Sequence, residues 1–392
     1  MRAEPVRIAD IAEQIRGVTY RSDEATTLPA PGYLPILRAG NIQDEGLDLS
    51  DLVFVPAARV SPKQKLRPHD VVIATSSGSL QVVGKAARVV EAFDGGFGAF
   101  CKVLRPNTRV VPSYFGHFFQ TPTYRKTVSS LAAGANINNL RNEHLDELLI
   151  PLPPLREHRR LAEILDKADA LRAKRRAALA ALEGLEGNLF LESFGDPILN
   201  RLGWPLVKLG LVGQLDRGVS KHRPRNAPEL LGGPYPFVQT GDVANCDGYL
   251  RSFNSTYSEN GLRQSKLWPA GTLCITIAAN IAKTGILTFD ACFPDSVVGF
   301  RAEEPATVEF IRVWLSFWQA RLEEAAPEFA QKNINLAILR DLEVPVPPLD
   351  LQRDFARRIA AIEALKTSHR SSLAALDSLF ASLQHLAFSG GL

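Results

Sequence analysis

The sequence predicts a duplicated α+β protein in which each of two globular domains is followed by a long helix. Three observations predict it: short motifs recur about 200 residues apart, each copy ends in a proline box, and a proline-free helical segment follows each box. With 392 residues, 45% of them apolar, the chain can bury a core in two or more domains.

The first group of repeated motifs keeps one register, a shift of 201 residues. It aligns RGVT at 16–19 with RGVS at 217–220, PILRAGNI at 35–42 with PFVQTGDV at 236–243, and KLRPHDVVI at 65–73 with KLWPAGTLC at 266–274. The shift then shortens by a few residues for ANINNL at 135–140 and KNINLAIL at 332–339, and for the boxes PLPPL at 151–155 and PVPPL at 345–349. Small differences in loop length cause such a drift. A period this long is typical of a duplicated domain, because solenoid repeats span only about 20–50 residues.

Within each copy, the coarse secondary structure follows from residue types and spacing. Runs of β-branched residues bounded by Pro and Gly predict strands at 70–74 and 272–277. Aromatic-rich segments with helical spacing predict one helix at 113–130 and another at 307–324, each packed on a sheet. Each globular unit is therefore expected to be an α+β domain of about 150 residues.

The proline boxes and the segments after them form the connections. Proline donates no backbone hydrogen bond and favours extended geometry before it, so each box predicts a stiff exit from its domain; a proline-rich ligand for an adaptor domain is the alternative. From 157 to 193 there is no proline, and apolar residues recur at three- and four-residue steps. We expect the two helices to pack on each other, the alternative being that each packs on its own domain. The basic run at 172–176 is expected to lie on a solvated face, the alternative being a contact with phosphate or with a partner. The expected apolar seam consists of Ile164, Ala168, Leu171, Ala178, Leu182, Leu185 and Leu189, with Ile362, Leu365, Leu376, Leu379 and Leu383 in the second copy.

Composition excludes several classes of protein. No apolar run reaches the roughly 18–20 residues of a membrane span, and MRAEPVRIADIAEQ at the start carries charges where a signal peptide needs an apolar stretch, so a cytoplasmic protein is expected. The four cysteines, at 101, 246, 274 and 292, form no CxxC pair, which argues against a zinc site or a disulfide framework and predicts reduced, mostly buried thiols. A net charge of +3 does not by itself indicate nucleic-acid binding.

Motifs for catalysis are missing from the sequence. Both Pro-Pro pairs are followed by leucine, so neither forms an Asn/Asp-Pro-Pro-aromatic motif. Gly96-Phe97-Gly98 lacks the strand–loop–helix context of a cofactor loop, and Pro294-Asp295 has no downstream Glu-x-Lys partner as a metal-dependent nuclease needs. We therefore expect no catalytic residues, no metal and no cofactor in this chain.

Taken in order along the chain, these features resemble the specificity subunits of Type I restriction-modification systems. The resemblance rests on PLPPLREHRRLAEILDKADALRAKR at 151–175, on its counterpart PVPPLDLQRDFARRIAAIEAL at 345–365, on NIN at 136–138 and 333–335, and on GDP at 195–197 followed by Trp204. It covers essentially the whole chain. The second helix begins with DLQR at 350–353 where the first has REHR at 156–159, a departure confined to the helix start.

The resemblance implies two tandem α+β target-recognition domains joined by two long helices that pair as an antiparallel coiled coil, with internal pseudo-twofold symmetry. The implied boundaries are 1–150 and 197–344 for the recognition domains, and 151–196 and 345–392 for the proline boxes with their spacer helices. Each domain is then expected to bind one half of a split double-stranded DNA site, at a spacing set by the helices.

The resemblance also implies partners. Two modification (methyltransferase) subunits hold S-adenosylmethionine and methylate adenine N6, and restriction (endonuclease/translocase) subunits use ATP and Mg, in a system of defence against foreign DNA. A duplicated protein-interaction scaffold without DNA readout is the alternative function.

Candidate DNA-contacting residues are cations, amides and hydroxyls on loops, because such side chains contact phosphates and base edges. The densest basic loop runs from 217 to 225, with a solvated loop as the alternative. For the residues beside Gly40 and Gly241, capping of a turn is the alternative, and for Lys332 and the asparagines at 136, 138, 139, 333 and 335 it is capping of a helix. The candidates are Arg21, Arg38, Asn41, Ser77, Lys85, Arg217, Lys221, His222, Arg223, Arg225, Gln239, Asn280, Lys283, Lys332 and Asn333.

Overall fold

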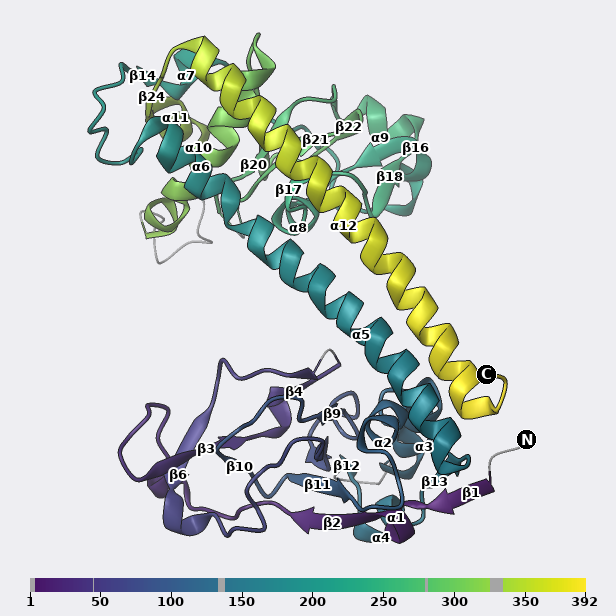
Figure 1. Ribbon diagram of the computed structural model, residues 1–392. Helices are drawn as coiled ribbons and strands as arrows, with labels where there is room; N and C mark the ends of the chain where they lie inside the picture. Colours follow the sequence, from purple (N-terminus) through teal and green to yellow (C-terminus); the bar gives the residue numbers. More distant parts are fainter. Residues whose placement is uncertain (1–3, 45, 133–137, 279–280, 325–333) are drawn as a thin grey trace. The chain divides into compact units, whose positions relative to one another are not determined.

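The computed structural model describes residues 4–44, 46–132, 138–278, 281–324 and 334–392. The chain divides into two compact units: unit 1 is Met1–Ala177 with Arg370–Leu392, and unit 2 is Ala178–His369 (Figure 1). Each unit combines helices with β-sheets, which confirms the predicted arrangement of two tandem domains of mixed helix and sheet.

The first strand of unit 1, β1, pairs with β13, which contains the start of the proline box at 151–155. Its main sheet has the antiparallel order β2-β11-β7-β9, and a smaller sheet has the order β10-β3-β6. The elements are β1 (Glu4–Arg7), α1 (Ile8–Ile11), β2 (Ala12–Arg16), β3 (Tyr33–Leu37), β4 (Ile42–Gln43), β5 (Gly46–Leu47), β6 (Val53–Pro56), β7 (Val71–Ala74), β8 (Ser76–Ser77), β9 (Ala86–Arg88), β10 (Gly96–Phe97), β11 (Cys101–Pro106), α2 (Pro112–Phe118), α3 (Pro122–Ala132), β12 (Asn138–Asn139), α4 (Asn142–Asp146), β13 (Leu149–Leu152) and α5 (Leu155–Glu183).

The main sheet of unit 1 is buried on both faces, because successive side chains of a strand point to opposite sides. Val71 and Ile73 face the aromatic residues of α2 and α3, whereas Val72 and Ala74 face a second apolar cluster that includes Phe97. Figure 1 shows α2 and α3 beside the first turns of α5. The predicted strand at 70–74 is therefore confirmed as β7.

Unit 2 repeats this plan with small additions. Its main sheet has the order β15-β23-β20-β21-β17, and its smaller sheet has the order β18-β16-β22-β19. The elements are α6 (Leu185–Phe194), β14 (Leu206–Lys208), α7 (Leu209–Val212), β15 (Gln214–Arg217), β16 (Leu231–Phe237), α8 (Thr240–Ala244), β17 (Gly248–Leu250), β18 (Ser255–Tyr257), α9 (Glu259–Arg263), β19 (Leu267–Trp268), β20 (Leu273–Thr276), β21 (Thr284–Leu287), β22 (Ala291–Cys292), β23 (Val297–Arg301), α10 (Pro305–Glu324), α11 (Leu336–Asp341), β24 (Glu343–Pro345) and α12 (Leu349–Ser389).

The core of unit 2 also lies on both faces of its main sheet. Leu273 and Ile275 of β20 pack with the aromatic residues of α6 and α10, and Cys274 packs with Trp268 and Phe293 on the opposite face. The predicted strand at 272–277 and the predicted helix at 307–324 are confirmed as β20 and α10.

Two predicted helices are divided in the structure. The segment at 113–130 forms α2 and α3, because Thr121 accepts a hydrogen bond from Tyr124 N at 3.2 Å and Pro122 has no N–H to continue α2. The segment at 157–193 forms α5 and α6, which are separated at Gly184. Both proline boxes are extended as predicted, but they also pair as strands, β13 with β1 and β24 with β14.

The predicted apolar seam is only partly right. Ala168 and Leu189 are buried, but Leu171 and Leu365 are half exposed, and the next residues, Arg172 and Lys366, lie inward instead. Arg172 Nε donates to Asp377 Oδ1 at 2.6 Å and its guanidinium lies 4.3 Å from the centre of the Phe380 ring. The prediction that the basic run lies wholly on a solvated face is therefore wrong for Arg172, which contacts α12 within unit 1.

One buried polar side chain links each long helix to its own domain. His158 Nδ1 donates to Pro153 O at 3.1 Å, and His158 Nε2 accepts from Val111 N at 3.3 Å, just before α2. In unit 2, Gln352 Nε2 donates to Pro347 O at 2.8 Å, and its Oε1 accepts from Thr307 Oγ1 at 2.8 Å. The departure at the start of the second helix thus replaces the histidine with an amide that makes equivalent hydrogen bonds.

The contacts of His158 require its neutral form, because a proton on Nε2 would face the N–H of Val111. Burial lowers the pKa of His158 from its ordinary value of 6.5, despite the hydrogen bond to Pro153. The unfolded chain therefore takes up the proton first, and stability should fall as the pH decreases below about 6.5. We predict that His158→Gln weakens this dependence, measured as the free energy of unfolding between pH 8 and 5. Parallel curves for the two proteins would contradict the assignment.

Candidate nucleic-acid interface

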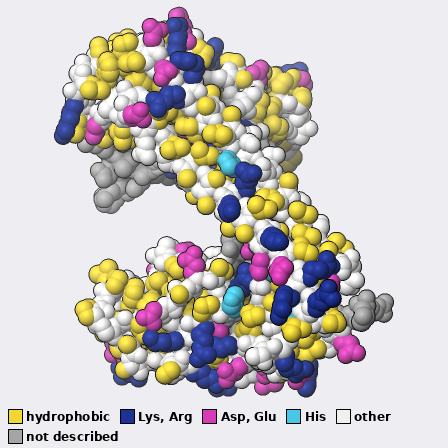
Figure 2. All heavy atoms as spheres, in the orientation of Figure 1, with side chains coloured by type: hydrophobic (Ala, Val, Ile, Leu, Met, Phe, Trp, Pro, Cys, Tyr) yellow, Lys and Arg dark blue, Asp and Glu magenta, His cyan; other side chains and the backbone are white. Residues whose placement is uncertain are grey.

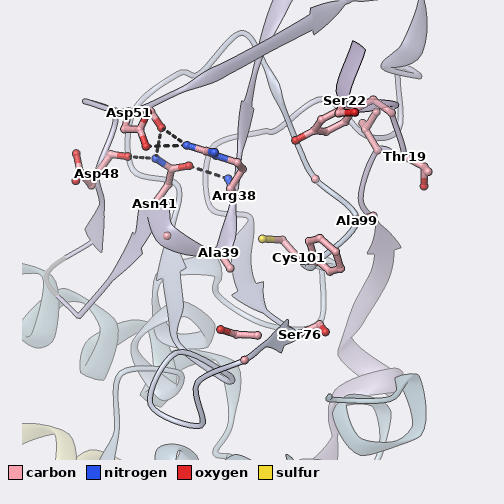
Figure 3. A pocket seen from close by; sticks show the side chains of 17 residues that line it. Thr19, Ser22, Arg38, Ala39, Asn41, Asp48, Asp51, Ser76, Ala99 and Cys101 are labelled. Carbon is pink, nitrogen blue, oxygen red and sulfur yellow. Dashed lines mark hydrogen bonds and ion pairs between the residues drawn. The ribbon is translucent and has the colours of Figure 1, made fainter. Parts of the chain in front are cut away.

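Unit 1 contains a cleft of about 1120 Å³ at the ends of its strands. It is lined by the segment after β2, the turn after β3, strand β8 and the loop between β10 and β11 (Figure 3). Figure 3 shows Arg38, Asn41 and Asp51 on one side of the cleft and Thr19, Ser22 and Ala99 on the other. Three of the predicted DNA-contacting residues, Arg38, Asn41 and Ser77, thus line one cavity.

The turn after β3 fixes Arg38 at the edge of this cleft. Asn41 Oδ1 accepts from Arg38 N at 2.8 Å, and Asn41 Nδ2 donates to Asp48 O and Asp51 O, both at 2.9 Å. Asn41 is buried, so its amide holds the loop together. Arg38 is about half exposed and donates to Asp51 Oδ2 at 2.7 Å, which orients its guanidinium while leaving other N–H donors available.

The remaining candidates of unit 1 differ in exposure. Arg21 is exposed and pairs with Asp23 at 3.1 Å. Lys85 is mostly buried and lies 3.3 Å from Asp44, so its charge is already partly neutralised. Ser77, in β8, pairs with Asn138 of β12 in antiparallel register, which keeps this edge of the cleft extended.

In unit 2, some cations of the predicted basic loop form ion pairs and others do not. Arg223 and Arg225 both pair with Asp295, in the loop before β23. Arg217 and Lys221 are exposed, and neither forms an ion pair with any residue in the part of unit 2 that the structure describes. The backbone around Lys221 and His222 is held by Gln264, whose O and Oε1 accept from their N–H groups at 3.3 and 3.0 Å.

The turn after β16 repeats the turn that holds Arg38. Gln239 N donates to Asp242 Oδ2 at 2.8 Å, as Arg38 N donates to Asn41, and Gln239 precedes α8 as Arg38 precedes the turn at 39–41. Asp242 Oδ1 also accepts from Asn254 Nδ2 at 2.6 Å. Lys283 follows Ala282, whose φ is +58°, and lines a separate cavity of about 420 Å³ with Arg312.

Comparison with known proteins identifies the family. The model of the Type I restriction modification DNA specificity domain matches residues 2–181 and again 202–376. The chain belongs to the Type I restriction modification DNA specificity family. The EcoKI specificity subunit of Escherichia coli K12 is 30% identical over 419 aligned positions, covering 98% of this chain and 88% of that one. The StySPI specificity subunit of Salmonella potsdam is 39% identical over 239 positions, covering 57% and 51%.

Solved structures share the fold of this specificity protein. The Type I restriction-modification S subunit from M. genitalium superposes with a TM-score of 0.62 at 14% identity, covering 98% of this chain and 96% of that one. A chain from a structure on complex assembly and conformational transition of the type I R-M system has a TM-score of 0.52 at 19% identity, covering 100% and 98%.

Three candidates of this specificity protein, Asn280, Lys332 and Asn333, lie outside the described residues. Helix capping is confirmed for Asn335, whose Oδ1 accepts from Ile338 N at 2.9 Å at the start of α11. Asn139 does not cap a helix: it lies in β12 and pairs with Ser76 of β8, and α4 begins after Arg141.

The described part of this specificity protein offers few groups suited to metal binding or nucleophilic chemistry. Within the described residues there is no cluster of three or more His, Cys, Asp or Glu side chains placed to hold a metal ion, and no helix long and apolar enough to cross a membrane. The four cysteines are free. Burial raises the pKa of Cys101 to about 12 and that of Cys274 well above its ordinary value, so these thiols stay protonated.

Sequence reasoning missed the loop that precedes β11 in unit 1 and β23 in unit 2, which lies beside other candidate residues in both units. Phe100 lines the cleft of unit 1, and Asp295 holds the basic loop of unit 2. In the sequence, Pro294-Asp295 resembles only part of a nuclease motif. The loop has no recognisable repeat in sequence, and its equivalence appears only from the strand registers on either side of it.

Proposed function

We propose that this chain is the subunit that selects the DNA sequence for a Type I restriction-modification complex, with each unit binding one half of a split site. The supporting observation is that both units build the same frame from different surface residues. In each, an Arg-Gly-Val segment and the strand that leads into a turn closed by an Asn or Asp side chain both contact the segment before β11 or β23. Similar frames with different side chains are suited to binding half-sites that differ in sequence.

The two long helices form the spacer in this proposal, as an antiparallel coiled coil with internal pseudo-twofold symmetry. Matching contacts occur in the two units. Arg172 of α5 pairs with Asp169 on its own helix and with Asp377 of α12 in unit 1. Lys366 of α12 pairs with Glu363 on its own helix and with Glu186 of α6 in unit 2. Within unit 1, His158 near the start of α5 stacks on Tyr114, and Phe388 near the end of α12 contacts the same ring in a tilted geometry, an arrangement that antiparallel helices produce.

The chain acts in this proposal by binding rather than by catalysis. Two methyltransferase subunits supply S-adenosylmethionine chemistry on adenine, and restriction subunits supply ATP- and Mg-dependent cleavage, so this chain holds neither cofactor. Its candidate DNA contacts are the exposed cations and the side chains around the cleft. Because its ligand is cellular and incoming DNA, the proposed location is the cytoplasm.

The test is a methylation map of DNA from cells that express this chain with its modification subunit. A split, non-palindromic motif with a constant gap and methyladenine in each half is the expected result. If the complex binds DNA but yields no such motif, the chain is a scaffold that does not select sequence, and the proposal fails.

The exposed cations of unit 2 give a second expectation. Arg217→Ala with Lys221→Ala removes two charges from the loop that corresponds to the cleft-lining segment after β2. We expect the slope of log affinity against log salt concentration to become shallower by about 2, since each phosphate contact contributes about 0.9. The control is Lys208→Ala, which should leave the slope unchanged. Lys208 is an exposed lysine of β14 that pairs with Asp341. A slope that is equal in both variants and in the wild type would place this loop away from DNA.

A further inference from the structure

The loop between β10 and β11 combines a fixed backbone with an exposed aromatic side chain. Phe100 O accepts hydrogen bonds from Thr75 N at 2.8 Å and Ser76 N at 3.2 Å. On the other side, Gly98 N donates to Leu37 O and Cys101 N donates to Gly98 O, each at 2.9 Å. The Phe100 ring is nevertheless 69% exposed and lines the cleft. A ligand that covers this ring removes a large apolar area from water, which stabilises the complex.

The equivalent loop of unit 2 carries the opposite chemistry. Cys101 pairs with Ala74 in unit 1, and Val297 pairs with Thr276 in unit 2. Ser296 O accepts from Ile277 N at 3.1 Å, as Phe100 O accepts from Thr75 N, so Phe100 corresponds to Ser296 and Ala99 to Asp295. Where the loop of unit 1 presents the Phe100 ring, the loop of unit 2 presents, one residue earlier, the carboxylate of Asp295, which holds the half-exposed Arg223 at 3.2 Å.

We infer that this loop determines specificity in both units, and that Phe100 reads its half-site by apolar contact with the 5-methyl group of a thymine. This inference rests on the proposed function and assigns the base chemistry of the cleft. Thymine carries the one apolar group exposed at a base edge in the major groove, and phenylalanine is a side chain that contacts it. The rigid backbone adds specificity, because little conformational entropy is lost when the ring is covered.

In unit 2 the same loop works through charge, from Asp295, one residue before the position that corresponds to Phe100. Asp295 orients Arg223, whose guanidinium is matched to the two acceptors of guanine. The two half-sites therefore differ in the chemistry read by one loop, an apolar contact in the first and a charge-assisted hydrogen bond in the second.

The first experiment repeats the methylation map with the complete complex carrying Phe100→Ala or Asp295→Asn. We expect Phe100→Ala to make one thymine position degenerate in one half of the motif, and Asp295→Asn to alter only the other half. Val90→Ala, which truncates an equally exposed apolar residue outside the cleft, should reproduce the wild-type motif. A wild-type motif that Phe100→Ala leaves intact would overturn the inference while upholding the proposed function, and absence of any wild-type motif would overturn both.

The second experiment isolates the methyl group. Deoxyuridine replaces thymidine at the affected position, which removes only the 5-methyl group. The wild-type complex should bind this DNA about fourfold more weakly, the loss expected for one buried methyl group, whereas Phe100→Ala should bind both DNAs equally. Equal losses in the two complexes would show that Phe100 does not contact the methyl group. A uniform loss of affinity on all sequences would assign the ring to DNA bending and overturn base readout.

Discussion

Replacing Glu186 by alanine is expected to lower the free energy of unfolding of unit 2 by about 3 kcal/mol, because it removes one partner from a buried network of charges. One Glu186 oxygen accepts from Arg312 Nη2 and the other from Lys366 Nζ, both at 2.7 Å. The side chains of Arg312 and Lys366 are 7% and 2% exposed. Each keeps one other carboxylate, Glu309 or Glu363, so the loss lies at the lower end of the usual range for a buried pair.

The measurement is urea unfolding of the full chain, followed by a probe in unit 2. Glu192→Ala, on the same helix, is the matched control, because Glu192 is exposed and lies 3.5 Å from Arg358; it should change stability by less than about 0.5 kcal/mol. Equal losses in the two variants would show that the network contributes no more than a surface pair.

The effect of Glu186→Ala should also depend on pH. Burial opposes ionisation of Glu186, but Arg312 and Lys366 hold the pKa of its carboxyl below the ordinary value of 4.5. The stability that depends on this carboxylate is therefore complete above about pH 4.5 and is lost as the pH falls through the lower pKa of the folded state. The difference between the wild type and Glu186→Ala should shrink over that range.

The repeat, the central strands and the helical connections could be predicted from the sequence because their signals are local. Val71–Ala74 and Leu273–Thr276 are β-branched runs between Pro and Gly, and the proline boxes mark the ends of the domains. The inward positions of the long helices could not be predicted in the same way. Apolar spacing selected Leu171 and Leu365, but the adjacent Arg172 and Lys366 lie inward, because carboxylates distant in sequence pair with them.

In the candidate site, too, features with local sequence signals could be predicted and those that depend on distant contacts could not. The turn at Arg38 and the basic loop after Arg217 could be located from glycine, asparagine and charge. The loop that carries Phe100 in unit 1 and Asp295 in unit 2 could not, because its two copies share no residue type and are matched only through the register of β11 with β7 and of β23 with β20. Two equivalent loops whose side chains have opposite chemistry cannot be found by a search for repeated sequence motifs.

Replacing Gly218 by alanine is expected to lower the stability of unit 2 by about 3 kcal/mol, since a small-to-large change in tight packing has no room to relax. A Cβ at Gly218 would lie 2.3 Å from Phe293 O and 2.4 Å from Pro294 O, both backbone atoms. Gly17, at the matching position of the Arg-Gly-Val motif, would place a Cβ 2.0 Å from Gly98 O. The repeated glycine is therefore explained by the close approach of two backbone segments, and neither Gly17 nor Gly218 has a positive φ.

Gly241→Ala is the matched control for Gly218→Ala, because no atom lies within 4 Å of its Cβ position; thermal or urea unfolding should separate the two variants clearly. The Gly218 contact is with residues 293–294, directly before Asp295, so the substitution must push that loop outward or prevent folding. If Gly218→Ala folds, its complex should lose selectivity in the half-site altered by Asp295→Asn and keep it in the other. Gly17→Ala should displace the loop that carries Phe100, so that its complex loses selectivity in the half-site altered by Phe100→Ala and keeps it in the other. A folded Gly218→Ala complex with an unchanged motif would show that the position of this loop does not set the sequence that unit 2 selects.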